Sequence, residues 1–283
     1  MEKRFHSIAE VMADLQAKTQ KNHSTSLETK SEDISSYDCT KCKDKGFILE
    51  NVPDLYPDGT QKVWADGTPK FVEFIKDCVC SKKRQSEHLL KFSEITDEFK
   101  NMTFGNFILD GKLEPIKNAH QCAVDYYKAF DQIKDQRCNS ISLLGQPGAG
   151  KTHLLTALAN NLIIKKQISV LYFPFVEGFN DLKNDFELLE EKLTKMKRIG
   201  VLFIDDLFKG RTRPTDFQIE QMFAVINYRY LNHKPIMVSS EKTVDELCDI
   251  DEALGTRIFQ MCKDYTVVIK GERKVLNHRL AGV

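Results

Sequence analysis

Two patterns of apolar and polar residues divide this chain. From about residue 96 onward, short apolar runs alternate with longer segments in which apolar residues recur every three or four positions. Short apolar runs predict buried strands, and the longer segments predict helices with one buried stripe. Regular alternation of the two is typical of a parallel sheet covered by helices on both faces. We therefore predict an α/β fold with strands at 141–145, 169–173, 200–205, 235–239 and 265–269, and helices near 115–134, 152–165, 179–198, 216–231 and 243–263.

The pattern upstream of residue 96 is different. Residues 20–36 are rich in Ser, Thr, Lys and Glu and predict a linker, whereas residues 37–80 contain the turn dipeptides Asp58-Gly59 and Asp66-Gly67 of a small hairpin-built module. A basic helix is predicted from Lys82 to Phe92, and no internal repeat is expected. We predict an N-terminal helix and linker at 1–36, a second module at 37–93 and a larger α/β domain at 94–283. The stripe that predicts the N-terminal helix consists of Phe5, Ile8, Val11, Met12 and Leu15.

Composition excludes some classes of protein. The 41 basic and 41 acidic residues balance, so no global charge attracts nucleic acid, and any such binding depends on local patches. No apolar run approaches the length of a membrane span, and the first residues lack the apolar core of a signal peptide. We expect a cytosolic (cytoplasmic) protein that does not enter membranes. In a reducing compartment, its 8 cysteines are not expected to form a disulfide framework.

The strand predicted at 141–145 runs into the pattern GxxxxGKT, a loop that cradles nucleotide phosphates. Glycines allow consecutive backbone N–H groups to wrap a polyphosphate, and the following helix adds its positive dipole end. We expect Lys151 to meet the β- and γ-phosphates and the Thr152 hydroxyl to bind Mg²⁺. The loop thus predicts binding of ATP or GTP through Gly145, Gln146, Pro147, Gly148, Ala149, Gly150, Lys151, Thr152 and His153.

The apolar run at 201–204 ends in Asp205 and Asp206. A buried parallel strand that delivers acids at its carboxyl end is where a Walker B acid belongs. We expect Asp205 to hold Mg²⁺, directly or through water, and Asp206 to polarise the attacking water. Because aspartate is about one methylene shorter than glutamate, hydrolysis is expected to be slow.

Four cysteines form a second candidate site. Cys39 and Cys42 have CxxC spacing, and Cys78 and Cys80 have CxC spacing. A tight turn in the first pair and a strand in the second would each point two sulfurs at one ion. We predict a Zn²⁺ site with these four ligands; a redox CxxC is the alternative, but the segment lacks a thioredoxin-like context.

Together, the cysteine module, the segment Ile95–Phe107, the phosphate loop and the Phe203–Leu207 run resemble the DnaC/DnaI family of bacterial and phage helicase loaders, which are AAA+ ATPases. The resemblance spans about residue 37 to the C-terminus. It implies a sensor 1 position at Ser240 or Glu241, an arginine finger at Arg257 that acts in a neighbouring subunit, and a weaker sensor 2-like contact from Arg279.

The resemblance also implies a function: binding of the replicative hexameric helicase, its placement on single-stranded DNA, and release controlled by ATP, by a protein that is a homo-oligomer when assembled. The cysteine module and N-terminal helix are the expected helicase-binding part, and the loop at 209–213 with Tyr228 or Tyr230 is a candidate DNA contact. Three alternatives stay open: a transposition-type AAA+ regulator, an adaptor that binds ATP for structure alone, and a small-molecule kinase with a zinc-bearing lid.

Overall fold

The computed structural model describes residues 37–182, 185–210 and 213–280. The predicted N-terminal helix at 5–19 and the linker at 20–36 lie outside the described residues. The chain divides into two compact units, residues 1–45 and 46–283. The division into three domains given above therefore stays a prediction.

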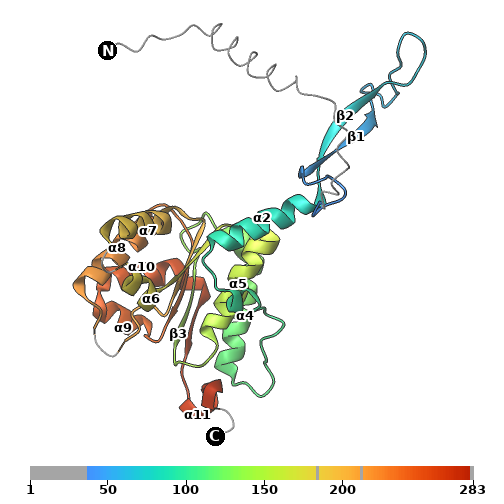
Figure 1. The fold of residues 1–283 in the computed structure, drawn as a ribbon. Coiled ribbons are helices and arrows are strands. Elements are labelled where there is room, and N and C mark those ends of the chain that lie inside the picture. Colours follow the sequence, from blue (N-terminus) through green and yellow to red (C-terminus); the bar gives the residue numbers. More distant parts are fainter. Residues whose placement is uncertain (1–36, 183–184, 211–212, 281–283) are drawn as a thin grey trace, which may run out of the picture. The chain divides into compact units, whose positions relative to one another are not determined.

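The second unit contains a five-stranded parallel sheet in the order β4-β5-β6-β3-β7 (Figure 1). All predicted strands are confirmed to within one residue at each end. Strand β6 lies between β3, which precedes the phosphate loop, and β5, which ends in Asp205. The strands are β3 (Ile141–Gly145), β4 (Val170–Pro174), β5 (Val201–Asp205), β6 (Ile236–Ser240) and β7 (Thr266–Ile269).

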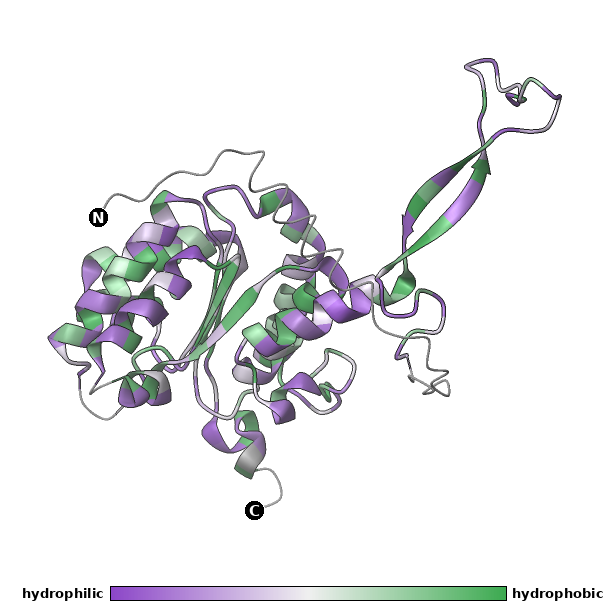
Figure 2. Ribbon diagram, turned by 45° about the horizontal axis from the view of Figure 1, so that its top comes forward, coloured by the Kyte–Doolittle hydropathy of each residue, from purple (hydrophilic) through white to green (hydrophobic). Residues whose placement is uncertain are grey.

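Helices cover both faces of this sheet (Figure 1). Alternate residues of β5 point to opposite faces: Leu202 and Ile204 join one buried cluster, and Val201 and Phe203 join the other. Figure 2 shows strongly hydrophobic strands between helices that carry hydrophilic outer residues. The α/β fold class is confirmed. The Leu202 face is covered by α6 (Phe175–Asp181), α7 (Phe186–Arg198), α8 (Asp216–Leu231), α9 (Val244–Ile250) and α10 (Glu252–Cys262), and the Val201 face by α2 (Val79–Phe92), α4 (Glu114–Ile133) and α5 (Lys151–Lys166).

Short elements complete the unit: α3 (Asp97–Lys100), η1 (Lys263–Tyr265), α11 (Arg273–Leu276) and η2 (His278–Leu280). The basic helix predicted at 82–92 is confirmed as α2. A hydrogen bond joins α2 to the end of α5: Ser86 accepts from Nε2 of Gln167, the residue that follows α5, at 2.6 Å. Among the described residues, no helix is both long enough and apolar enough to cross a membrane.

The predictions of single helices at 179–198 and 243–263 are wrong, because each segment forms two helices. Asp185 begins α7 by accepting a hydrogen bond from the Leu188 N–H at 2.9 Å. Asp251 begins α10 in the same way, with the Leu254 N–H at 2.7 Å. An N-cap carboxylate accepts a hydrogen bond from a backbone N–H that has no partner within the helix, and so favours a new helix start. The apolar spacing runs on across each break and does not reveal it. A single helix over 179–198 with one buried apolar stripe would also bury Phe186, which is instead 76% exposed.

The predicted hairpin is confirmed as β1 (Phe47–Pro53) and β2 (Phe71–Asp77), antiparallel in the register Phe47↔Asp77 to Pro53↔Phe71. The expectation of no internal repeat is wrong in the connection between these strands. Residues 56–63 and 64–71 share the pattern aromatic-x-Asp-Gly-Thr-x-Lys-apolar.

The two repeats also share their geometry. In each, the aromatic residue's N–H donates to the threonine carbonyl at 2.8 Å, and the threonine hydroxyl donates to the aspartate at 2.6 Å. In each, the lysine ammonium lies over the aromatic ring, at 5.4 Å from Tyr56 and 4.9 Å from Trp64. The same short sequence therefore folds twice into the same turn.

Candidate nucleotide-binding site

The phosphate loop has the backbone that its glycines predict. Gly145, Gly148 and Gly150 have φ angles of +99°, +75° and +83°, in the left-handed region that favours glycine. Lys151 begins α5, and its ammonium donates to the carbonyls of Gly145 at 2.7 Å and Gln146 at 2.8 Å. Burial lowers the pKa of Lys151, against the opposing effect of nearby carboxylates. The lysine therefore rests against its own loop, within reach of a bound phosphate.

The C-terminal segment lies against this loop. The His278 backbone N–H donates to the Gly148 carbonyl at 3.1 Å, and His278 Nδ1 is also 3.1 Å from that oxygen. A Cβ on Gly148 would lie 2.0 Å from Asn277 Oδ1, so a larger residue would require the Asn277 side chain to move, and the φ of +75° also favours glycine. Arg279 follows on η2, and its side chain lies outside the described part of the structure.

Asp205 is the centre of a hydrogen-bond network. The Thr152 hydroxyl donates to Asp205 Oδ1 at 2.9 Å, the Tyr172 hydroxyl donates to Oδ2 at 3.2 Å, and the Ser239 hydroxyl donates to Oδ1. Burial raises the pKa of Asp205, and the neighbouring Asp206 charge acts in the same direction. Thr152 and Asp205 thus form an oxygen ligand pair that suits Mg²⁺.

Asp206 lies beside Asp205 and is held by a lysine. Asp206 Oδ2 is 2.6 Å from the Lys209 ammonium, which is also 3.8 Å from Glu241 Oε1. These side chains line a cavity of about 690 Å³ together with Lys151 and Thr152. The phosphate loop and both predicted acids therefore meet around one space.

The two sensor 1 candidates occupy different places. Glu241 lines the cavity, whereas the Ser240 hydroxyl is fully buried and donates to the Leu207 carbonyl at 2.6 Å. The sequence reasoning missed Ser239 and Tyr172, which contact Asp205 directly. A signal existed for Ser239, because polar hydroxyls at the end of a buried strand require partners.

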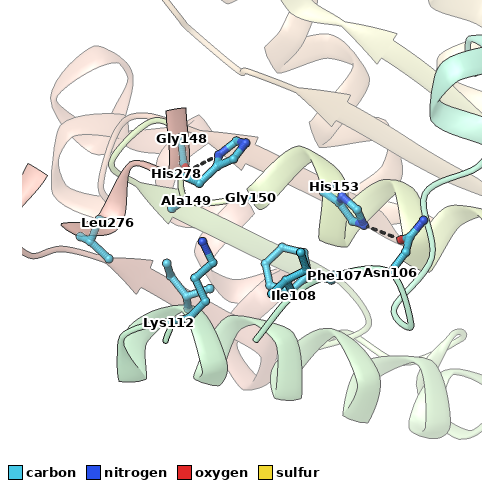
Figure 3. Close-up of a pocket in the computed structure, with 11 residues that line it drawn as sticks. Asn106, Phe107, Ile108, Lys112, Gly148, Ala149, Gly150, His153, Leu276 and His278 are labelled. Atoms are coloured by element: carbon cyan, nitrogen blue, oxygen red, sulfur yellow. Dashed lines mark hydrogen bonds between the residues drawn. The ribbon is translucent and has the colours of Figure 1, made fainter. Parts of the chain in front are cut away.

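A smaller cavity of about 200 Å³ adjoins the phosphate loop (Figure 3). Gly148, Ala149 and Gly150 form one wall, and the apolar side chains of Phe107, Ile108, Ile116 and Leu276 form much of the rest. His153 braces this wall: its Nε2 lies 3.0 Å from Asn106 Oδ1, and its ring contacts Phe107 edge-on at 5.2 Å. An apolar slot beside a phosphate site suits the base of a nucleotide.

Arg257 does not line either cavity. Its Nε donates to Asn227 Oδ1 at 3.0 Å, and its guanidinium lies 5.1 Å from the Phe223 ring and 5.6 Å from the Tyr230 ring. The predicted finger is thus held by α8, outside the nucleotide site of its own chain.

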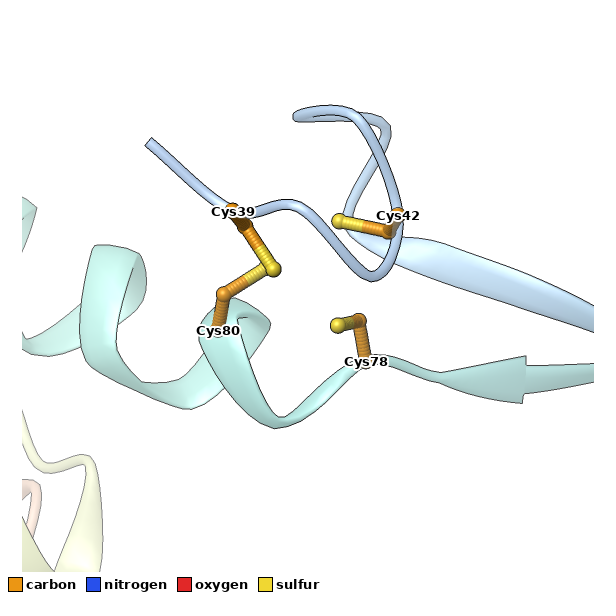
Figure 4. A group of neighbouring side chains, drawn as sticks. All are labelled: Cys39, Cys42, Cys78 and Cys80. Atoms are coloured by element: carbon orange, nitrogen blue, oxygen red, sulfur yellow. The ribbon is translucent and has the colours of Figure 1, made fainter. Parts of the chain in front are cut away.

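The four predicted cysteine ligands come together. Figure 4 shows their side chains pointing toward one another, and their sulfur atoms all lie within 4.8 Å of each other. Four thiolates at about 2.3 Å from a tetrahedral Zn²⁺ would be about 3.8 Å apart, so the cluster fits this ion with a small contraction. The site consists of Cys39, Cys42, Cys78 and Cys80.

Comparison with known proteins agrees with this geometry. A family model described as IstB-like ATP binding protein matches residues 76–280. The phage-like element PBSX protein XkdC of Bacillus subtilis (strain 168) is 53% identical over 254 residues, covering 89% of this chain and 89% of that protein. The uncharacterized protein YqaM of the same strain is 49% identical over 282 residues, covering 88% of each.

Two solved structures share the fold. The DnaC helicase loader matches with a TM-score of 0.51 and 24% identity, over 62% of this chain and 100% of that chain. DnaI matches with a TM-score of 0.51 and 22% identity, over 64% of this chain and 94% of that chain. The resemblance to DnaC and DnaI predicted from the motifs is confirmed at the level of the fold.

Proposed function

Because this chain belongs to the family of IstB-like ATP-binding proteins, we propose that it is a slow, regulated ATPase that binds a replicative hexameric DNA helicase and loads it onto single-stranded DNA. ATP binding and hydrolysis control release of the helicase. The observation that carries the ATPase proposal is the hydrogen bond of 2.9 Å between Thr152 and Asp205, which joins the phosphate loop to the acidic end of β5.

The residues around this bond have complementary roles. Lys151 exchanges the carbonyls of Gly145 and Gln146 for phosphate oxygens, and Thr152 and Asp205 hold Mg²⁺. The ion neutralises phosphate charge when it is bound. Asp206 orients the attacking water and accepts its proton. The apolar slot beside Gly148–Gly150 takes the adenine base.

The loader proposal is supported by the shared fold of the DnaC helicase loader and by the place of Arg257. An arginine outside its own nucleotide site completes a site only in a second subunit, so ATP hydrolysis requires a homo-oligomer. The cysteine module, as a Zn²⁺ site, belongs to the helicase-binding part of the chain.

Mixing the full chain with a replicative helicase of Bacillus subtilis, single-stranded DNA and ATP tests this function. We expect a helicase complex and an ATP turnover that changes on addition of DNA. Asp206→Asn should bind ATP but lose turnover, and Lys151→Ala should lose binding. No complex and no DNA-dependent turnover would contradict the loader. Binding of duplex DNA without helicase would favour the transposition-type regulator, and phosphate transfer to a nucleoside would favour the kinase.

A further inference from the structure

Lys209 lies between two carboxylates of the larger cavity. Its ammonium is 2.6 Å from Asp206 and 3.8 Å from Glu241. Asp206 is the residue to which we assign activation of water. Its carboxylate is already paired with the Lys209 ammonium of the same chain. The side chains are partly exposed, 43% for Lys209 and 28% for Asp206, so the pair can open without unfolding.

The backbone builds this pair. Asp206 and Phe208 both have a φ of +55°, a left-handed conformation that is costly without glycine and persists only where neighbours hold it. The Asp206 N–H donates to the Ser239 hydroxyl at 2.7 Å, the Leu207 N–H to the Ser239 carbonyl at 2.9 Å, and the Lys209 N–H to the Asp206 carbonyl at 2.9 Å. The turn therefore holds the Lys209 backbone beside Asp206.

Charge in the cavity favours the same pairing. Among the described lining residues, five carboxylates face two lysine ammonium groups. The Lys151 ammonium is occupied by backbone carbonyls, which leaves Lys209 to meet the acids. The carboxylates belong to Glu98, Glu177, Asp205, Asp206 and Glu241.

We propose that Lys209 is a positioning residue that restrains the Asp206 carboxylate and slows ATP hydrolysis until the pair opens. A carboxylate oxygen that accepts a hydrogen bond from an ammonium group is occupied, so it is less available to orient a water molecule. Ion pairs of this exposure favour the paired state of Lys209 and Asp206 over the open state by a factor of roughly two to five. The inference rests on the proposed function, because it requires hydrolysis through Asp206.

Steady-state ATP hydrolysis by the full chain tests the restraint. Lys209→Ala should raise kcat about two- to fivefold with KM for ATP nearly unchanged, whereas Lys209→Arg should keep the low rate because it keeps the cation. Lys128→Ala is the matched control, since it removes another ion pair between residues three apart, Asp125–Lys128, on α4. Its rate should equal that of the wild type. Thermal unfolding and ATP titration of each variant establish that it folds and binds nucleotide.

The outcomes separate the two proposals. An active wild type whose kcat is unchanged or lower in Lys209→Ala would overturn the restraint, and so would a rise in KM alone, which would make Lys209 a phosphate-binding residue. Equal increases in Lys209→Ala and Lys209→Arg would also overturn it. A wild type that hydrolyses no ATP under any condition would contradict the proposed ATPase itself.

Discussion

Replacing Arg229 by methionine should destabilise the protein by about 4 kcal/mol. Arg229 is fully buried on α8, and its guanidinium donates to backbone carbonyls only. Burial lowers the pKa of Arg229 to about 9, so the group is still charged at neutral pH. The acceptors are Met196 at 2.8 Å, Lys197 at 3.3 Å, Ile199 at 3.0 Å, Gly200 at 3.0 Å and Pro235 at 2.6 Å.

The magnitude follows from these acceptors. The last carbonyls of α7 have no partner within their helix, and Arg229 supplies one across the gap between α7 and α8. The Pro235 carbonyl keeps a second donor, the Leu202 N–H at 3.2 Å. The other four lose theirs; the bond to Met196 is buried and the other three are partly buried. At about 1 kcal/mol for each unsatisfied acceptor, the total is ~4 kcal/mol.

Urea unfolding measures this loss. With an m value of about 3 kcal/mol per molar, the midpoint should fall by about 1.3 M. Arg137→Met is the control, because Arg137 donates to one carbonyl, that of Tyr230, and stacks on its ring at 4.1 Å. It should cost at most about 1 kcal/mol. A loss below about 1.5 kcal/mol in Arg229→Met would show that the carbonyls find other donors and would refute the reasoning.

Three further predictions concern the nucleotide, the metal and pH. Gly148→Ala should weaken ATP binding about tenfold or more in a titration, since its Cβ would lie 2.0 Å from Asn277 at a φ of +75°. Gly111→Ala is the control: Gly111 has a φ of +70° with nothing within 4 Å of the added Cβ, so this variant should bind ATP normally. Serine at Cys39 and Cys42 should abolish zinc in elemental analysis, whereas Cys138→Ser should retain it; zinc in the double variant would exclude the site. Glu94→Gln should cost less than about 1 kcal/mol at pH 7. Burial acts to raise the pKa of Glu94, but Lys192 and Lys195 together hold it below its ordinary value of 4.5. The contribution is therefore present above pH 4.5 and disappears as the pH falls through the lowered pKa. A difference from wild type that does not shrink as the pH is lowered below 4.5 would contradict this account.

The sequence by itself determined the elements that have a local cause. Apolar runs located all the strands of the parallel sheet, and the glycine spacing located the phosphate loop with its left-handed residues. Elements with a weak local cause differ from their prediction. The breaks before α7 and α10 depend on single capping aspartates, Asp185 and Asp251, inside a continuous apolar spacing. The repeat at 56–71 is present in the sequence but lacks the apolar periodicity that indicates helices and strands.

Only the tertiary structure decided which residues meet at the site. Strand order places β6 between β3 and β5, and this insertion brings the Ser239 hydroxyl to Asp205 and the Glu241 carboxylate to Lys209. Likewise, the C-terminal segment reaches the phosphate loop through His278 across 130 positions of the chain. The order of strands in the sheet and contacts between distant segments depend on the packing of whole faces, which no short stretch of residues encodes. The sequence therefore identified the parts of the nucleotide site, and the fold determined which residues they contact.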